Sequence, residues 1–234
     1  MKTSLVIPAY NEEARLGAFL ASVASFSAAH PQLIHEIIIV DDGSRDQTKR
    51  IAERYQSELP LKVIAHSANR GKGAAVQTGV MAATGDYIIF MDADGATPIT
   101  ELPKMLAALQ SHQIGIGNRW LPGAKTQRHS PLRRFSGWLY RHYMAIFGLG
   151  AIDTMCGFKG YRREVARALF ARLTEERWLF DTEVAYKAVR AGYTIKNFPI
   201  AWESKDGSKL DTKTLLKSAL QIWPLIQKLK RQTT

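Results

Sequence analysis

The first hundred residues alternate between short apolar segments and segments whose apolar residues recur at helical spacing. Residues 36–40 are almost continuous isoleucine and valine, the composition of a strand that is buried on both faces of a sheet. Alternating with it are expected strands at residues 4–8, 61–65 and 86–91 and expected helices at residues 11–27, 46–59 and 73–84. This alternation predicts an α/β fold with a mostly parallel sheet and helices on both faces.

A polar sequence follows each of the four expected strands. These sequences are Tyr10-Asn11-Glu12-Glu13, Asp41-Asp42-Gly43-Ser44, Asn69-Arg70-Gly71-Lys72-Gly73 and Asp92-Ala93-Asp94-Gly95. Because the carboxyl ends of parallel strands meet at one edge of a sheet, the four loops should form a cleft there, where open α/β sheets bind ligands. No linker, repeat or low-complexity tract divides the chain, so we expect a single domain over residues 1–234.

Two carboxylates separated by one residue, Asp92 and Asp94, come directly after an apolar strand. Both can reach one divalent cation, and oxygen ligands of this kind favour Mg²⁺ or Mn²⁺. Asp-Ala-Asp-Gly is also an ordinary turn sequence, so the pair alone leaves both interpretations open. Asp41 and Asp42 end the neighbouring strand. Four close carboxylates would repel one another without a cation or polar ligand, which favours a binding site.

The glycine-rich loop at residues 69–73 has no Ser or Thr after Lys72, so it is not a Walker motif. The chain also lacks G-x-G-x-x-G after its first strand, which argues against a dinucleotide-binding dehydrogenase. Lys72 stands where a helix is expected to begin, and a phosphate contact and a simple loop-to-helix junction both remain open there. The single cysteine, Cys156, is expected to be a packing residue rather than a nucleophile.

The formal net charge of +11 indicates an anionic partner. No acidic residue occurs between Glu101 and Asp153, and the basic residues in that stretch are Lys104, Arg119, Lys125, Arg128, Arg133, Arg134 and Arg141. A nucleic-acid-binding domain is an alternative that rests on charge alone. It leaves the carboxylates at the strand ends unexplained, because they would repel phosphate. We therefore expect no nucleic-acid partner.

Two segments, residues 131–149 and 213–230, combine an apolar helical stripe with aromatic and basic residues. Helices of this kind suit a membrane interface, although an apolar stripe is also typical of ordinary core. Spanning a bilayer takes about 20 consecutive apolar residues, and the chain has no such run. The first nine residues read as a strand rather than a signal peptide. We expect a cytoplasmic protein that is peripheral on the cytoplasmic face of a membrane, with an amphipathic basic helix over residues 212–234.

The order and spacing of these motifs resemble the family 2 glycosyltransferases of the GT-A fold. The motifs are Val6-Ile7-Pro8-Ala9-Tyr10-Asn11-Glu12, Ile39-Val40-Asp41-Asp42-Gly43-Ser44, Asn69-Arg70-Gly71-Lys72-Gly73 and Met91-Asp92-Ala93-Asp94. Three later motifs, at residues 153–159, 176–181 and 207–210, resemble the dolichyl-phosphate glucosyltransferases in particular, with the mannosyltransferases next closest. We expect a nucleotide-sugar-binding half over residues 1–118 and an acceptor-side half over residues 119–211.

The resemblance implies a glycosyltransferase that moves a hexose from a nucleotide-sugar, with inversion, to a polyprenyl or dolichyl phosphate at a membrane surface. UDP-glucose is the first choice of donor. GDP-mannose, another acceptor and a catalytically silent nucleotide-sugar binder are the alternatives. Mannosyltransferases of this group tend to place Gln two residues after the second Asp. Ala96 stands there, which weakens the mannosyl alternative and leaves part of the metal shell unassigned.

The resemblance also implies roles for individual residues. Those for the nucleotide are Pro8, Ala9, Tyr10, Glu12, Asp42, Lys72, Asp92 and Ala93, and those for a Mg²⁺ or Mn²⁺ ion are Asp92 and Asp94. Those for the acceptor phosphate are Arg119, Arg133, Arg134 and Ser136, while Lys209 would reach either phosphate group. Asp94, Arg119 and Lys209 are the expected catalytic residues. Asp181 and Glu183 would contact the donor sugar, although a carboxylate at a helix N-terminus explains Asp181 as well.

Overall fold

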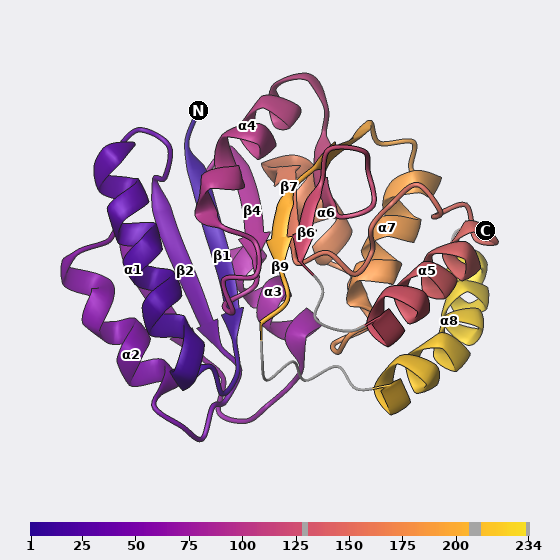
Figure 1. Ribbon diagram of the computed structural model, residues 1–234, viewed down its shortest axis with the longest axis horizontal. Coiled ribbons are helices and arrows are strands. Elements are labelled where there is room, and N and C mark those ends of the chain that lie inside the picture. Colours follow the sequence, from indigo (N-terminus) through magenta and orange to yellow (C-terminus); the bar gives the residue numbers. More distant parts are fainter. Residues whose placement is uncertain (128–130, 206–211, 233–234) are drawn as a thin grey trace.

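The protein, described here from a computed structural model, is built around a seven-stranded sheet (Figure 1). In spatial order the strands are β3 (Leu61–Ala65), β2 (Glu36–Asp41), β1 (Thr3–Ala9), β4 (Tyr87–Met91), β7 (Phe158–Arg162), β5 (Ile114–Asn118) and β8 (Ile195–Pro199). All neighbouring pairs are parallel except those that β7 makes with β4 and β5. The structure describes residues 1–127, 131–205 and 212–232, with the backbone alone for residues 131–136, 212–219 and 232.

Helices cover both faces of this sheet, as the alternation of segments predicts. One face carries α1 (Glu13–Ala29), α2 (Thr48–Arg54) and α4 (Leu102–Ser111), and the other carries α3 (Lys72–Ala82), α6 (Arg163–Phe170) and α7 (Phe180–Arg190). Strand β2 supplies both layers, because Ile37 and Ile39 enter one core and Ile38 and Val40 the other. The expected strand buried on both faces is confirmed.

The predicted helix over residues 46–59 is shorter in the structure. It is split into α2 and a 3₁₀ turn at Tyr55–Ser57. Asp46 does not enter the helix, because its carboxylate accepts the backbone N–H of Thr48 at 2.9 Å and fixes the turn that precedes α2. A second 3₁₀ turn, Ile99–Glu101, leads into α4.

Helix α3 lies close against the sheet because its residues are small. At Gly79 an added Cβ would stand 2.3 Å from Cγ1 of Val6 on β1, so the helix could not approach this closely with any side chain there. Close approach places Lys72, the first residue of α3, at the carboxyl edge of the sheet. The small residues of α3 thereby determine where Lys72 lies.

A second, two-stranded parallel sheet pairs β6 (Lys125–Gln127) with β9 (Ala201–Glu203). Strand β9 follows β8 almost directly, and its residue Trp202 lines a pocket at the carboxyl edge of the large sheet. These two short strands connect segments that lie more than seventy residues apart in the sequence.

Helices α5 (Pro131–Ala145) and α8 (Thr212–Gln232) lie together at one end of the molecule (Figure 1). Each has a buried side: Met144 of α5 and Ile222 and Ile226 of α8 belong to the core. Each also has exposed apolar residues, among them Trp138 and Trp223. The core interpretation is therefore confirmed for the buried side of each helix, and membrane contact of the exposed residues stays a prediction. Within the described residues, no helix is long and apolar enough to cross a membrane.

Candidate active site

A pocket of about 350 Å³ opens where β1, β2 and β4 end. Among the residues that line it are Pro8, Ala9, Tyr10, Glu12, Asp42, Lys72, Asp92, Ala93, Asp94 and Arg119, all of them predicted site residues. The parallel strand order thus brings together four loops that are far apart in the sequence, as expected. The same pocket contains residues to which the sequence assigned no role.

The loop after β1 is fastened to the loop after β2. Asn11 adopts a left-handed backbone conformation, with φ of 48°. Its N–H donates to Ser44 Oγ at 2.9 Å, and its side-chain oxygen accepts the N–H of Arg45 at 2.9 Å. The next residue, Glu12, donates its N–H to Thr48 Oγ1 at 2.7 Å, and its carboxylate binds Arg15 Nε at 2.8 Å. These bonds hold Tyr10 and Glu12 at the pocket wall.

Asp42, which the resemblance assigns to the nucleotide, lines the pocket and is hydrogen-bonded within the chain. Its carboxylate is buried and accepts four bonds: from His66 Nδ1 at 2.7 Å, Asn69 Nδ2 at 2.8 Å, Arg70 N at 2.9 Å and Gly71 N at 2.8 Å. These donors satisfy the carboxylate within the chain. Asp42 therefore shapes the 69–71 loop that lines the pocket.

The predicted cluster of four repelling carboxylates does not form. The Asp42 carboxylate is hydrogen-bonded by its own donors, and the neighbouring Asp41 is buried and accepts the N–H of Ser44 at 3.2 Å. Across the described residues, no three His, Cys, Asp or Glu side chains gather into a group that could hold a metal ion. The argument from repulsion therefore applies only to Asp92 and Asp94.

Asp92 is held between a lysine and a glycine. Lys72 Nζ lies 2.6 Å from its Oδ1. On the other side, Gly157 lies so close that a Cβ there would stand 1.9 Å from Oδ2, and Asp92 N donates to the Gly157 carbonyl at 3.0 Å. Lys72 also stands 5.6 Å from the centre of the Trp178 ring. Burial alone would lower the pKa of Lys72, but the nearby carboxylates of Asp92, Asp181 and Asp94 together outweigh it and raise that pKa.

Asp94 lines the same pocket, and its Oδ1 accepts the N–H of Ala96 at 2.9 Å. Burial, followed by the like charge of Asp92, raises the pKa of Asp94. Two carboxylates that disfavour each other's charge suit a divalent cation. Mg²⁺ in particular is commonly held by one or two carboxylates together with substrate phosphates. The residues present therefore fit a cation that arrives with a diphosphate, and a cation bound by protein ligands alone fits them less well.

Arg119 reaches the pocket from the end of β5, where it is clamped by Asp153. Its Nε and Nη2 each donate to this carboxylate at 2.8 Å, and its backbone N–H donates to the same group at 3.1 Å. The Trp202 ring lies 5.1 Å from the guanidinium carbon. Burial alone would raise the pKa of Asp153, but Arg119 outweighs it and lowers that pKa. The guanidinium is thus a fixed positive group beside the carboxylates.

Several residues of the pocket were missed from the sequence, namely Arg15, Met155, Gly157, Arg177, Trp178 and Trp202. Arg177 and Trp178 stand in a motif that the resemblance singled out, but only Asp181 received a role there. Gly157 stands in another such motif. Trp202 carried no signal, because it reaches the pocket only through the pairing of β9 with β6.

Glu183, which the resemblance assigns to the donor sugar, does not line the pocket. Glu183 is fully buried and accepts bonds from the N–H groups of Thr174 and Glu175 and from Lys187. Asp181 is also buried, 2.9 Å from Lys159 Nζ, and does not line the pocket. Both acids begin α7, but their carboxylates face the protein interior.

Four predicted residues are not placed by the structure. Lys209 lies outside the described residues. For Arg133, Arg134 and Ser136 the structure describes only the backbone, which is part of α5. Their proximity to the acceptor phosphate therefore stays a prediction.

Comparison with known proteins adds the family. A family model described as Glycosyl transferase family 2 matches residues 4–170. A dolichyl-phosphate beta-glucosyltransferase of Trichomonas vaginalis is 35% identical over 233 residues, which cover 94% of this chain and 69% of that protein. A human dolichyl-phosphate beta-glucosyltransferase is 34% identical over 225 residues, covering 88% of this chain and 69% of that protein.

The fold also has solved counterparts. Glucosyl-3-phosphoglycerate synthase from Mycobacterium tuberculosis, crystallised with Mn²⁺, UDP and glucosyl-3-phosphoglycerate, superposes with a TM-score of 0.68 at 21% identity and covers 94% of this chain and 77% of that one. This likeness confirms the GT-A fold. The sequence similarity, the fold and the pocket at the carboxyl edge of the sheet agree: the chain is an enzyme that belongs to glycosyltransferase family 2.

Proposed function

We propose that this enzyme transfers glucose from UDP-glucose to a dolichyl or polyprenyl phosphate, with inversion, at a membrane surface. The observation that carries the proposal is one pocket in which two carboxylates, Lys72 and Arg119 converge, in a chain 35% identical to a dolichyl-phosphate beta-glucosyltransferase. Residues 1–118 would hold the donor and residues 119–211 the acceptor, within a single domain.

The donor diphosphate would lie along the carboxyl edge of the sheet. Pro8, Ala9 and Tyr10 line the end of the pocket that we assign to the nucleoside, while Asp92 and Asp94 would hold Mg²⁺ or Mn²⁺ at the diphosphate. The cation, when bound, supplies charge stabilisation for the departing nucleoside diphosphate. Lys72, at the start of α3, donates to the same developing charge, since anions are favoured at a helix N-terminus.

The acceptor phosphate would bind on the side of Arg119. A lipid monophosphate is already ionised near neutral pH, so the nucleophile needs positioning more than deprotonation. Arg119 is suited to this task because Asp153 fixes its guanidinium in one orientation. Arg133, Arg134 and Ser136 of α5, and Lys209, are the further groups that we assign to this phosphate. In a single in-line displacement, the phosphate oxyanion bonds to the anomeric carbon of the sugar as the bond from that carbon to the nucleoside diphosphate breaks, which inverts the configuration at that carbon.

The lipid places the enzyme at a membrane, and α5 and α8 supply a surface for it. Their exposed apolar residues are Trp138, Leu139, Leu220 and Trp223, and Ile146 directly follows α5. Lys228, Lys230 and Arg231 stand near the end of α8, where basic residues favour an anionic lipid surface. We propose that the enzyme is peripheral on the cytoplasmic face.

The decisive experiment incubates the protein with Mg²⁺, a polyprenyl phosphate and a panel of nucleotide-sugars and detects lipid-linked hexose by mass. We expect a lipid-linked hexose with UDP-glucose and its loss on adding EDTA, with recovery on excess Mg²⁺ or Mn²⁺. Asp94→Ala should abolish transfer with little change in Tm, whereas Glu53→Ala, which changes an exposed carboxylate on α2, should transfer normally. Full turnover in excess EDTA would overturn the metal role, and transfer from GDP-mannose alone would overturn the donor.

A further inference from the structure

The ion pair of Lys72 and Asp92 stands inside the donor pocket. Its atoms are 2.6 Å apart, and both side chains line the cavity. The tight packing of α3 against β1 sets the backbone position of Lys72, and the Trp178 ring lies 5.6 Å from its ammonium. On the other side of Asp92, Gly157 leaves no room for another side chain. Of the two carboxylates expected to hold a divalent cation, Asp92 is therefore already paired with the Lys72 ammonium.

We infer that Lys72 is the internal counter-ion of Asp92 and yields this carboxylate to a divalent cation only when a nucleoside diphosphate arrives to take up the ammonium. The inference rests on the proposed binding of a nucleotide and a cation in this pocket, and it is independent of which sugar or acceptor is used. Lys72 thereby makes the binding of cation and nucleotide cooperative.

The charges at the site oppose the binding of a cation without a nucleotide. A cation alone would meet only Asp92 and Asp94, since the described residues contain no group of three metal-binding side chains. It would also stand within a few ångströms of the Lys72 ammonium, and like charges at that distance repel strongly in a partly buried site. A diphosphate removes both obstacles. Its oxygens supply the missing ligands of the cation, and they accept hydrogen bonds from the Lys72 ammonium.

Removing the charge of Lys72 should therefore raise the affinity for Mn²⁺ alone and lower the affinity for UDP in the presence of Mn²⁺. We expect Lys72→Gln to bind Mn²⁺ about tenfold more tightly in the absence of nucleotide, measured by electron paramagnetic resonance, because a repelling charge is gone. With Mn²⁺ saturating, the same variant should bind UDP about tenfold more weakly in calorimetry, because a charge-assisted bond is lost. With UDP binding in the absence of Mn²⁺ unchanged, the factor by which each ligand strengthens the other should fall about tenfold.

Three further variants define the result. Lys72→Met removes the charge and must behave like Lys72→Gln, while Lys72→Arg keeps the charge and should not tighten Mn²⁺ binding in the absence of nucleotide. Lys49→Gln removes an equal charge from the exposed pair with Glu53 on α2 and should change neither affinity. The Tm of each variant reports folding.

If Lys72 had only a structural role, its removal would weaken the binding of both Mn²⁺ and UDP. Only the counter-ion role predicts tighter binding of Mn²⁺. Unchanged or weaker Mn²⁺ binding in both Lys72→Gln and Lys72→Met, with UDP and Mn²⁺ still bound by the unmodified protein, overturns the inference alone. If the unmodified protein binds neither UDP nor Mn²⁺, the proposed function fails and the inference falls with it.

Discussion

At Gly157 the backbone lies directly against the carboxylate of Asp92. A methyl group there would stand 1.9 Å from Oδ2, closer than two non-bonded atoms can come, so Asp92 would have to move. Displacing a reacting group by about 1 Å can cost a hundredfold in rate. We expect Gly157→Ala to lower transfer about a hundredfold, measured as lipid-linked hexose formed per minute, and to weaken UDP binding in the presence of Mn²⁺.

Gly17 offers a matched control for this change. On α1 an added Cβ would meet only Ile51 Cγ2, at 3.8 Å, which is an ordinary contact. Alanine also favours a helix interior over glycine by up to about 1 kcal/mol. Gly17→Ala should leave transfer unchanged and stability equal or higher. Equal activity of Gly157→Ala and Gly17→Ala would show that Asp92 tolerates displacement.

Cys156 is fully buried, and burial raises the pKa of its thiol to about 12. The thiolate is the reactive form, and an unfolded cysteine has a pKa of about 8.5. Iodoacetamide at pH 8, followed by mass spectrometry, should therefore label the folded protein on the order of a thousandfold more slowly than the protein in guanidinium.

The same shift gives the sign of a pH effect on stability. Because the folded pKa lies above the unfolded one, the stabilising contribution of the neutral thiol is complete below about pH 8.5 and is lost as the pH rises toward 12. Replacing Cys156 with Ala should flatten this part of the stability curve. Rapid labelling of the folded protein would contradict the burial of the thiol.

At the scale of elements, α5 and α8 present apolar side chains at the surface. Trp138 is 47% exposed and Leu220 is 72% exposed. Burying such side chains in a lipid interface is worth about 1.5–3 kcal/mol each when burial is complete. If each side chain is only partly buried in the lipid, it contributes part of this free energy. Trp138→Gln together with Leu220→Gln should then weaken binding to anionic vesicles at least about tenfold in a flotation assay.

Transfer to a short, soluble acceptor should stay normal in this double variant, since neither side chain lines the pocket. Met81→Gln on α3 is the matched control, because Met81 is also exposed and lies on a different helix. If Met81→Gln weakens vesicle binding equally, the effect is not specific to α5 and α8. Loss of activity with the soluble acceptor would instead connect these helices to the reaction itself.

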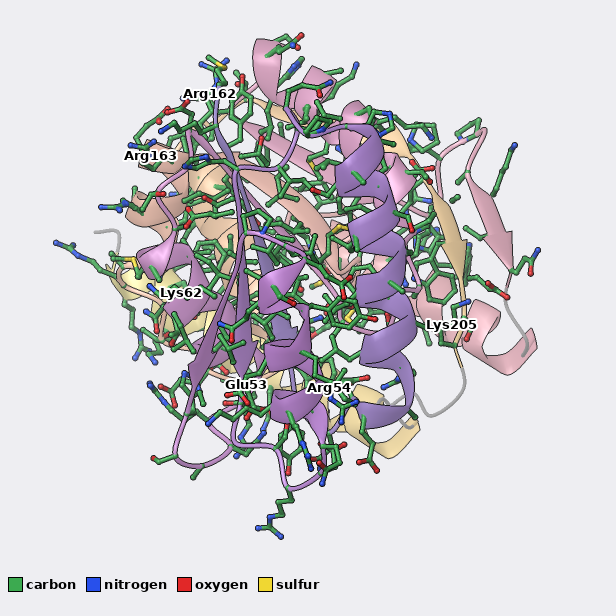
Figure 2. All side chains as sticks on the ribbon, turned by 90° about the vertical axis from the view of Figure 1, so that its left-hand side faces the viewer. Glu53, Arg54, Lys62, Arg162, Arg163 and Lys205 are labelled. Atoms are coloured by element: carbon green, nitrogen blue, oxygen red, sulfur yellow. The ribbon has the colours of Figure 1, made fainter. Side chains whose placement is uncertain are left out.

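At the scale of the whole molecule, part of the positive charge is structural. Figure 2 shows Arg162 and Arg163 together near the top of the view, at the edge of the sheet where β4 begins and away from the pocket. Arg162 donates to the carbonyls of Leu109 and Gln110, and Arg163 donates to Gly85 O and Asp86. These arginines satisfy backbone carbonyls, so the net charge overstates what is available to an anionic partner.

Ligand binding to the folded state should raise the Tm of the whole chain. A ligand at a hundred times its Kd adds about 2.7 kcal/mol, which at roughly 2–4 °C per kcal/mol gives a shift of about 5–10 °C for a protein of this size. We expect UDP with Mn²⁺ to give such a shift in a thermal melt and GDP with Mn²⁺ a smaller one. Uridine with Mn²⁺ is the control for the diphosphate, and a larger shift with GDP would point to a guanosine donor.

The sequence by itself determined the four strands of the first hundred residues and the edge where the polar loops after them meet. The almost continuous isoleucine and valine of residues 36–40 predicted a strand buried on two sides, and parallel connection puts all four polar loops at one edge. The five later strands were not predicted. Motif order also identified the family. These properties follow from local composition and from rules of chain connection, which act along the sequence.

The tertiary structure alone decided what each polar side chain does. A buried carboxylate takes whichever donors the fold brings within about 3 Å, and these come from distant segments. Asp42 accepts hydrogen bonds from the loop at residues 69–71, Arg119 pairs with Asp153, and Lys72 pairs with Asp92. Glu183 is withdrawn from the pocket for the same reason, because its partners lie in the preceding loop. The spacing of residues along the sequence does not give these distances. The polar residues of the site could therefore be predicted, but the partner of each one could not.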